Sequence, residues 1–326
     1  MFIYILRRIL YAIPILIGVN ILTFSLFFIV NTPNDIARIH LGQKYITQSA
    51  IEHWKSAHGY HLPLFVNDQK EGVEQFKQTI FYQKSVRLFS FDFGSSDAGQ
   101  DISFDIKERM IPSLVIAIPA LLLGLIVNIT VALLFVFFRK TYIDTLGIII
   151  CIMMMSISGL FYIIGGQYLL AKILKLVPVS GYESGWSLIK FLILPVCIGV
   201  IGGVGSGARW YRTLFLEEIH KDYVKTALSK GFSELYVLFK HILRNALIPI
   251  LTGVVVLLPL LFLGSLLTES FFGIPGLGSY TIDAIEQQDF AIVRAMVFLG
   301  SVLYIIGLVL TDISYTLADP RVKLND

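Results

Sequence analysis

The sequence predicts an all-α integral membrane protein with six transmembrane helices, and two observations support this fold class. The first is composition: 56% of the 326 residues are hydrophobic, 15% are charged, and the mean hydropathy is +0.75. Soluble domains hold about 45–50% apolar and about 25% charged residues, so the excess apolar surface must face lipid. The second is a set of six runs without Asp, Glu, Lys or Arg: Ile9–Val30, Ile111–Phe138, Leu146–Ala171, Phe191–Gly207, Ala246–Leu267 and Ala295–Thr311. About 20 apolar residues cross a hydrocarbon core about 30 Å thick, and the two shorter runs can extend over neutral neighbours or tilt.

The first run is predicted to be an uncleaved membrane anchor. Arg7 and Arg8 precede it, as in a signal peptide. The run is longer than the apolar core of about 7–15 residues that signal peptides carry, however, and no small-residue cleavage pattern follows Val30.

Basic residues predict that both termini lie inside the cell. With the N-terminus inside, the inner segments hold thirteen Lys and Arg residues, and the two short outer connections hold only Lys172, Lys175, Lys190 and Arg294. Lys and Arg accumulate on the cytoplasmic side of short loops, so the predicted topology is N-in and C-in.

The first loop, Asn31–Met110, is predicted to be a long outer region with some helix. Thr47 can cap a helical segment that runs to about Ala57, and a second candidate covers about Val66–Gln83. Glycines near Gly94 predict a turn-rich return to the membrane. Loops of this length are usually functional or form small domains.

The hydrophilic loop between the fourth and fifth spans is predicted to be a helix–glycine–helix hairpin. Asp222 is expected to cap a helix over Tyr223–Lys230, and Gly231 can end it in the left-handed conformation. Ser233 is expected to cap the next helix. On spacing alone, the hairpin is either an amphipathic anchor on anionic lipid or a docking surface for another protein.

Six motifs, spread along nearly the whole chain, resemble a known family. Lys225-Thr-Ala-Leu-Ser-Lys-Gly231 resembles the "EAA" loop of permease subunits in binding-protein-dependent ATP-binding-cassette importers, in the form that the dipeptide/oligopeptide (peptide/nickel) family carries. The further matches are the Arg-Arg-flanked first helix, Phe91-Asp-Phe-Gly-Ser-Ser96, Leu176-Val-Pro-Val-Ser-Gly181, Glu269-Ser-Phe-Phe-Gly-Ile-Pro-Gly-Leu-Gly278 and Asp319-Pro320-Arg321. The chain departs from the family at Asn31-Thr-Pro-Asn-Asp35, where relatives usually have Pro-Gly-Asp-Pro.

The resemblance implies a transporter permease subunit, not an enzyme, in the bacterial plasma (inner) membrane. The chain would form half of a translocation pathway for peptides or similar small solutes. Its implied parts are residues 1–30, the N-terminal tail and first helix; 31–110, the outer loop region; and 111–326, a five-helix permease core with the EAA loop at 209–247. The residues implied to couple the pathway to ATPases are Lys225, Thr226, Ala227, Lys230 and Gly231.

The partners implied are a second homologous permease, two ATP-binding-cassette ATPase subunits or domains, an extracytoplasmic solute-binding protein and membrane lipid, with no nucleic acid. No cofactor is expected in this chain, because it lacks a Walker-type ATP site and ATP and Mg would bind the partner ATPases. Peptide, nickel and other small-ligand substrates all remain open.

The Gly- and Pro-broken segment after the fifth span is a candidate gate. Non-helical backbone at membrane depth is tolerated only where it is buried in protein or lines a cavity. The candidate gate and pathway residues are Glu269, Phe272, Pro275 and Gly276. The alternative is an interfacial loop with Glu269 in water.

The remaining polar residues indicate neither catalysis nor metal binding. Asp312 is expected to form an interfacial ion pair, and the irregularly spaced His53, His58 and His61 are expected to be solvated. A secondary transporter would need charges within the spans, which are nearly charge-free. A structural membrane scaffold would need no gate-like loop.

Overall fold

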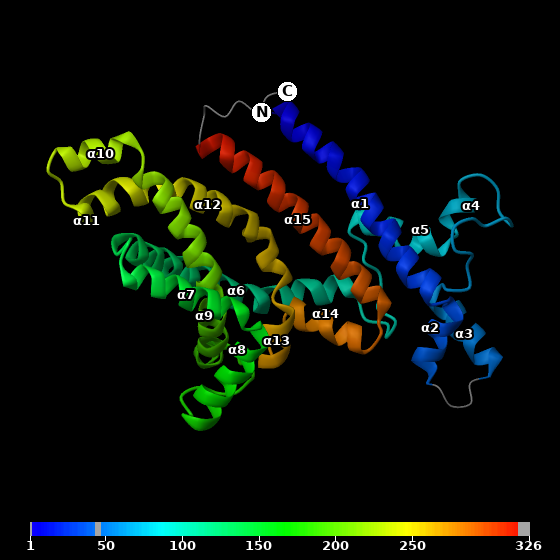
Figure 1. Ribbon diagram of the computed structural model, residues 1–326. Coiled ribbons are helices and arrows are strands. Elements are labelled where there is room, and N and C mark those ends of the chain that lie inside the picture. The colour runs from blue at the N-terminus through cyan, green and yellow to red at the C-terminus, as the bar shows by residue number, and fades with distance from the viewer. Residues whose placement is uncertain (1, 43–46, 319–326) are drawn as a thin grey trace. The chain divides into compact units, whose positions relative to one another are not determined.

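The computed structural model describes residues 2–42 and 47–318, and it is built of helices, as predicted (Figure 1). Within those residues the one β-type pairing outside a helix is an isolated bridge between Ser95 and Asp101. The α-helices are α1 (Phe2–Val30), α2 (Pro33–Leu41), α3 (Gln48–His58), α4 (Glu74–Lys77), α5 (Ile80–Lys84), α6 (Ile102–Phe137), α7 (Tyr142–Ser156), α8 (Gly159–Gly166), α9 (Leu188–Ile219), α10 (Asp222–Ser229), α11 (Glu234–Val237), α12 (Leu243–Leu260), α13 (Leu266–Phe272), α14 (Leu277–Glu286) and α15 (Phe290–Ala318).

Five helical segments are long and apolar enough to span a membrane, and a bent pair of helices provides a sixth candidate. The five are Leu6–Phe28, Ile102–Phe137, Gly185–Ile219, Glu234–Leu263 and Phe290–Ser314. The predicted third span, Leu146–Ala171, is not one straight helix: it divides into Tyr142–Ser156 and Gly159–Ile173, which meet at 89°. The break falls at Ile157, whose extended backbone (φ −88°, ψ 127°) ends α7. An uncharged run alone did not reveal this change of direction.

The chain forms two compact units. Among the described residues, the first consists of those up to Met110 together with Tyr280–Val309, and the second consists of Ile111–Ser279 together with Leu310–Ala318.

The first unit is held together by aromatic and aliphatic side chains from α1 and the outer loop. Its core contains Phe24 and Phe28 of α1, Ile36 of α2, and Tyr60, with Phe290 of α15 packed against it. Figure 1 shows α1 and the beginning of α15 side by side, in agreement with the 5.1 Å between the ring centroids of Phe27 and Phe290.

The outer loop is more finely divided than its sequence predicted. The helix predicted after Thr47 is present as α3, and Gly59 ends it in the left-handed conformation (φ +74°). The second predicted helix, about Val66–Gln83, is wrong as one element: only α4 and α5 form, and Thr79 separates them with an extended backbone (φ −131°) and caps α5.

An unpredicted helix, α2, fills the segment where the chain departs from the family motif. Thr32 is its N-cap, Pro33 is its first residue, and Asp35 completes a capping box with Thr32. Proline is favoured at the first helical position and the reciprocal hydrogen bonds satisfy two terminal donors, so this signal was present in the sequence.

The second unit is organised around close packing of α9 against α7 and α6. A Cβ atom at Gly205 would lie 2.7 Å from the carbonyl oxygen of Cys151, and one at Gly207 would lie 2.4 Å from Asn128 Nδ2. The glycines of α9 therefore allow helices to approach closely, as small residues do in membrane interfaces. Arg212 of α9 also donates two hydrogen bonds to the carboxylate of Asp144 on α7, at 2.8 and 2.7 Å.

Candidate functional site

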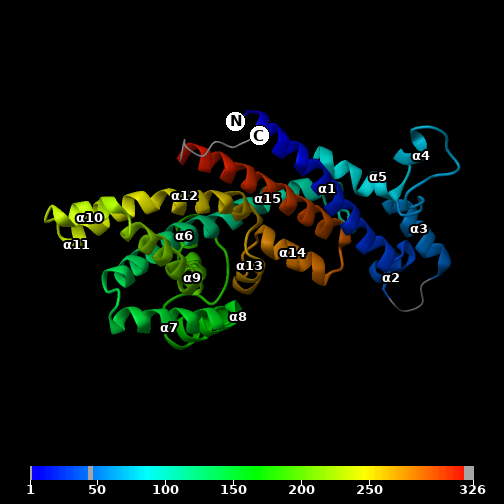
Figure 2. The same ribbon diagram turned by 45° about the horizontal axis from the view of Figure 1, so that its top comes forward.

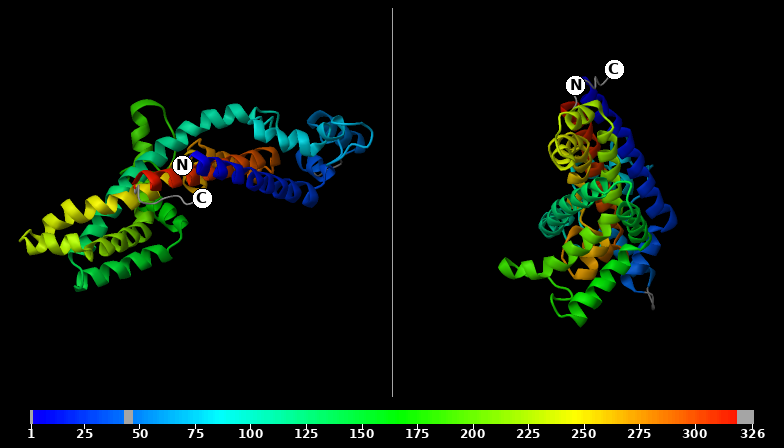
Figure 3. Two further views of the ribbon diagram at one scale, coloured as in Figure 1. Left: turned by 90° about the horizontal axis from the view of Figure 1, so that it is seen from above. Right: turned by 60° about the vertical axis from the view of Figure 1, so that its left-hand side comes forward.

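The predicted hairpin is formed by α10, Gly231 and α11, which we call the α10–α11 hairpin. Figure 2 and Figure 3 show it beyond the end of α12. Gly231 has a φ of +86° and donates to the carbonyl of Leu228 at 2.9 Å, and Phe232 donates to the carbonyl of Ala227 at 3.4 Å. This pair of bonds is a Schellman cap, which needs a left-handed residue after the helix and so favours glycine. The helix begins at Asp222 with Lys221 as N-cap, one residue earlier than predicted.

The two faces of α10 have different environments. Val224 (2% exposed) and Ala227 (6% exposed) lie in an apolar core with Val237, Leu238 and Ile242. Ala227 was expected at a contact with another protein, but its small side chain packs inside this chain. The i, i+3 spacing of Val224 and Ala227 is the sequence signal for that buried face.

The other predicted coupling residues lie on the exposed face. Lys225, Thr226, Lys230 and Gly231 are all exposed. Lys225 Nζ lies 2.9 Å from Asp222 Oδ1, and this ammonium holds the pKa of the Asp222 carboxyl below its usual range through a hydrogen bond and charge attraction. The hairpin therefore offers solvent an ordered surface that carries Lys225 and Lys230 beside a glycine without a side chain.

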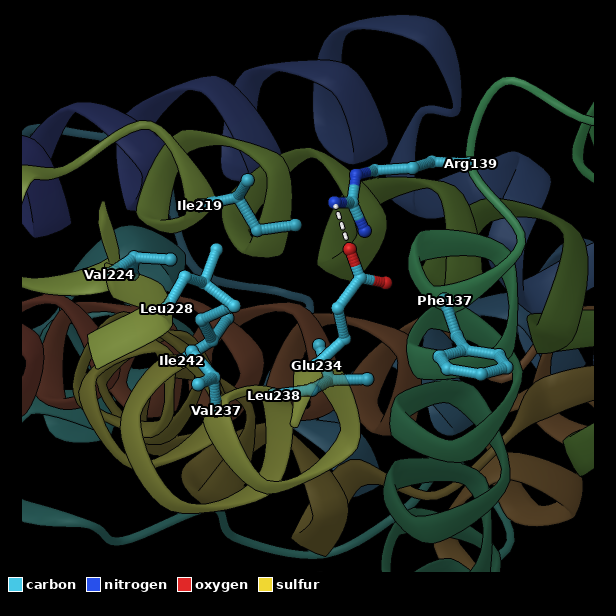
Figure 4. Close-up of a pocket in the computed structure, with 9 residues that line it drawn as sticks. All are labelled: Phe137, Arg139, Ile219, Val224, Leu228, Glu234, Val237, Leu238 and Ile242. Carbon is cyan, nitrogen blue, oxygen red and sulfur yellow. Dashed lines mark hydrogen bonds and ion pairs between the residues drawn. The ribbon is translucent and has the colours of Figure 1, made fainter. Parts of the chain in front are cut away.

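A small cavity of about 30 Å³ lies beneath the hairpin (Figure 4). Its apolar wall comes from α10, α11 and the turns beside them, and Phe137 of α6 closes another side. Arg139 Nη2 lies 3.3 Å from Glu234 Oε1, which joins the residues after α6 to the first turn of α11. The hairpin thus rests on the ends of α6 and α9 through packing and an ion pair.

The segment 264–279, which we call the Glu269 loop, encloses a carboxylate. Glu269 is 1% exposed, which excludes the water-exposed alternative for this side chain. Its carboxylate accepts hydrogen bonds from the backbone N–H groups of Ser265 (3.1 Å), Gly278 (2.7 Å) and Ser279 (3.2 Å). A carboxylate near the N-terminus of α14 also interacts favourably with that helix dipole.

Glycines make room for this carboxylate. A Cβ atom at Gly264 would lie 1.9 Å from Glu269 Oε1, and one at Gly276 would lie 2.2 Å from Glu269 Oε2. Ser113 of α6 adds a hydroxyl that accepts from the N–H of Leu277 at 2.8 Å. Of the other predicted gate residues, Phe272 is 2% exposed and Gly276 is buried, whereas Pro275 is exposed. Three of the four candidates therefore form a closed loop core.

The predicted Leu176–Gly181 turn packs against the Glu269 loop. The N–H of Gly181 donates to the carbonyl of Phe272 at 2.8 Å, and Gln167 Nε2 donates to the carbonyls of Val179 and Phe271 at 3.1 and 3.0 Å. Two separate motifs of the sequence thus form one assembly at the end of α13.

The break between α7 and α8 lines a cavity of about 260 Å³. Ile157 and Gly159 come from the break, Gly199 and Gly202 come from α9, and Thr268 comes from α13. This site was not predicted from the sequence. Its signal is Ser156-Ile-Ser-Gly159, a small-residue interruption within an apolar run.

The remaining candidates add no second site. Within residues 2–42 and 47–318, no three His, Cys, Asp or Glu side chains gather to hold a metal ion. The motif Asp319-Pro320-Arg321 lies outside the described residues.

Comparisons with known proteins agree along the whole chain. Residues 109–324 match the family described as binding-protein-dependent transport system inner membrane component, and residues 1–120 match the N-terminal family of such membrane components. A Brucella abortus protein, provisionally named a permease protein of a peptide transport system, is 33% identical over 325 residues, or 98% of both chains.

Two Bacillus subtilis proteins are also similar. The dipeptide transport system permease protein DppB is 32% identical over 250 residues, which are 76% of this chain and 79% of the relative. The oligopeptide transport system permease protein AppB is 29% identical over 329 residues, which cover 98% of this chain and 99% of the relative.

The helices and the comparisons define a multi-pass transport protein of the bacterial inner membrane. The chain belongs to the family of binding-protein-dependent transport system inner membrane components. The predicted class, transporter permease, is confirmed at this level.

Proposed function

We propose that this chain is a permease subunit of an ATP-driven importer for peptides or similar small solutes. The relatives named for dipeptide and oligopeptide transport support the peptide class. The importer would also contain a second permease, two ATPases and an extracytoplasmic binding protein. ATP and Mg would bind the ATPases, because this chain carries no Walker motif.

The α10–α11 hairpin is the proposed coupling element, and its two-sided environment is the observation that carries this proposal. Val224 and Ala227 anchor the hairpin in the chain's own core, while Lys225, Lys230 and Gly231 are exposed. A rigid, anchored element with an exposed face can transmit a displacement from a partner. The basic side chains are suited to carboxylates or carbonyl oxygens on an ATPase.

The proposed topology has both termini in the cytoplasm, with the α7–α8 pair acting as one broken span. The hairpin and the short inner loops then share the basic side of the membrane. In this arrangement residues 31–110 form the extracytoplasmic region, and the five spans after it form the permease core with the coupling loop 209–247.

The cavity at the broken span is the proposed segment of the translocation pathway within this chain. Interrupted helices in transporters place polar backbone beside a cavity rather than lipid. Ile157 and Gly159 at the break line this cavity together with Thr268, which belongs to the Glu269 loop. A displacement of the loop would therefore displace one wall of the cavity. The position of the loop beside this cavity supports a gating role for it. The Glu269 carboxylate would hold the loop together through its hydrogen bonds to backbone N–H groups.

Uptake by a Gly231→Asp variant tests the coupling proposal. We expect normal amounts of the protein in the membrane but no ATP-driven uptake of a labelled dipeptide, because the added carboxylate and a Cβ at φ +86° alter the exposed face. Gly231→Asn is the matched control, since asparagine tolerates the left-handed region better than other residues with side chains. Wild-type uptake by Gly231→Asp would exclude the hairpin as the coupling element.

Affinity purification tests the proposed assembly. The tagged chain, extracted in mild detergent, is expected to bring with it one ATPase type and a second permease. Recovery of this chain without either partner would contradict the importer proposal.

A further inference from the structure

The first unit contains a polar cavity that the transport mechanism above does not use. The cavity has a volume of about 350 Å³, within the range of small-molecule sites. Its wall includes Asp92, Phe93, Gly94 and Ser95, which belong to one of the motifs that the sequence analysis singled out. The other walls come from the end of α3, from α5 and the turn after it, and from the first turn of α15.

Arg294 of α15 gives this cavity a buried cation with spare hydrogen-bonding capacity. The residue is 4% exposed and lines the cavity. Its Nε donates to the carbonyl of Phe290 at 3.2 Å and its guanidinium lies 4.9 Å from the centre of the Phe28 ring, but its buried Nη1 has no hydrogen-bond partner. A buried guanidinium nitrogen without an acceptor is costly, so a ligand that supplies one is favoured.

Lys84 of α5 provides a second cation in the same wall. Its Nζ lies 5.1 Å from the centre of the Tyr60 ring. Burial lowers the pKa of the Lys84 ammonium, and the positive charge of Arg294 lowers it further. Within the described part of the chain, neither Lys84 nor Arg294 has a carboxylate within 4.0 Å.

The nearby carboxylates already have partners. Asp92 lines the cavity, lies 3.9 Å from Arg87 and accepts from the N–H of Gly94. Asp97 accepts from the hydroxyl of Tyr60 at 2.9 Å and lies 3.5 Å from His40 Nε2. Asp289 accepts from the N–H groups of Asp97 and Ile292. Asp97 and Asp289 offset part of the positive charge from a distance, but they do not line the cavity.

We propose that this cavity binds the C-terminal carboxylate of a short peptide, held by Arg294 and Lys84. A guanidinium presents parallel N–H groups that match the two oxygens of a carboxylate. Arg87 also lines the cavity, but it lies beside Asp92, so Lys84 and Arg294 are the lining cations without a carboxylate partner among the described residues, and competition by inorganic phosphate tests the selectivity for a carboxylate. The choice of a peptide as the ligand rests on the proposed function, whereas the binding of a carboxylate by Arg294 and Lys84 does not.

Calorimetric titration of the full chain in lipid nanodiscs, without ATP or other subunits, tests this site. The probes are trialanine and its C-terminal amide. Trialanine is expected to bind about tenfold or more tightly than the amide, because the amide removes one charge-assisted interaction. Lys84→Gln is expected to lose about tenfold in affinity for trialanine, whereas Lys70→Gln, an exposed substitution outside the cavity, is expected to bind like the wild type.

Several results would overturn the site. Equal binding of trialanine and its amide would do so, as would full affinity in folded Lys84→Gln protein. In a competition titration, inorganic phosphate that displaces trialanine as effectively as acetate does would show that the site does not select a carboxylate. Arg294→Lys, which keeps the charge but not the paired N–H groups, is expected to weaken binding of the acid more than that of the amide.

A separate uptake assay distinguishes this proposal from the proposed function. ATP-driven peptide uptake that continues without carboxylate-dependent binding would overturn the site alone. Carboxylate-dependent binding without any ATP-driven peptide uptake by the assembled complex would keep the site and overturn the importer.

Discussion

The α10–α11 hairpin and the Glu269 loop both join two short helices through glycine, but glycine serves a different purpose in each. At Gly231 an added Cβ would meet nothing within 4 Å, so only its φ of +86° requires glycine. At Gly276 an added Cβ would lie 2.2 Å from Glu269 Oε2, so space requires it. Glycine therefore permits a left-handed backbone in the hairpin, whereas in the loop it makes room for a side chain inside the chain.

Loss of the Glu269 side chain should have the largest effect on stability. Glu269→Ala would leave the N–H groups of Ser265, Gly278 and Ser279 without their acceptor. At about 1–3 kcal/mol for each buried unpaired group, we expect a loss of about 3 kcal/mol or more. Thermal unfolding in detergent measures it. Glu269→Gln, which keeps one carbonyl acceptor, should lose less, and an unchanged midpoint in Glu269→Ala would show that the carboxylate does not hold the loop.

Crowding of the same carboxylate should have the next largest effect. Gly276→Ala places a methyl group against Glu269 and Ser113, and overpacking of this kind costs about 1–3 kcal/mol. The same unfolding assay applies. Gly203→Ala is the control, because a Cβ there meets nothing within 4 Å and the residue lies within α9. If both variants unfold at the same temperature, the close packing around Glu269 has no energetic consequence.

Gly231→Ala should have a smaller effect on stability. The left-handed conformation costs a residue with a Cβ about 1–2 kcal/mol, and no steric clash adds to it. Gly231→Asn should recover part of that loss. A loss at Gly231 as large as that at Gly276 would remove the distinction between the two regions.

Lys225→Gln should have the smallest effect on stability. Its exposed pair with Asp222 is screened by water, so the unfolding midpoint should not change. ATP-driven uptake should nevertheless fall, because this side chain faces the proposed ATPase. Equal uptake by Lys225→Gln and the wild type would assign coupling to the other exposed residues of the hairpin.

The hairpin was far more predictable from sequence than the Glu269 loop. Gly231 and Ser233 act locally, within a few residues of the helix ends that they define, and both have the predicted roles. The acceptors and donors around Glu269 depend on a chain reversal at Gly273 and on Ser113, which is 156 positions away along the chain. Helix-capping patterns in the sequence reveal such local contacts, but they do not reveal contacts between residues that lie far apart along the chain.

The break in the third span was not predicted, for a related reason. Hydropathy measures how apolar a run is, and Ile157 remains apolar while its backbone turns. The two half-helices pack closely on α9, with Ile198 against Gly166 and Cys151 against Gly205, and the hydropathy of the run does not record these contacts. No local pattern states which neighbour a glycine will meet.

The helix α9 has a mechanical consequence for the proposed importer. Its 32 residues run from Leu188 to Ile219, and His220 and Lys221 connect it to the hairpin. Gly199 and Gly202 on the same helix form part of the wall of the 260 Å³ cavity. At about 1.5 Å per residue, Gly202 lies about 25 Å and Gly199 about 30 Å from Ile219. The helix between those glycines and Ile219 is continuous, so we expect a partner that displaces the hairpin along the axis of α9 to displace that cavity wall as well.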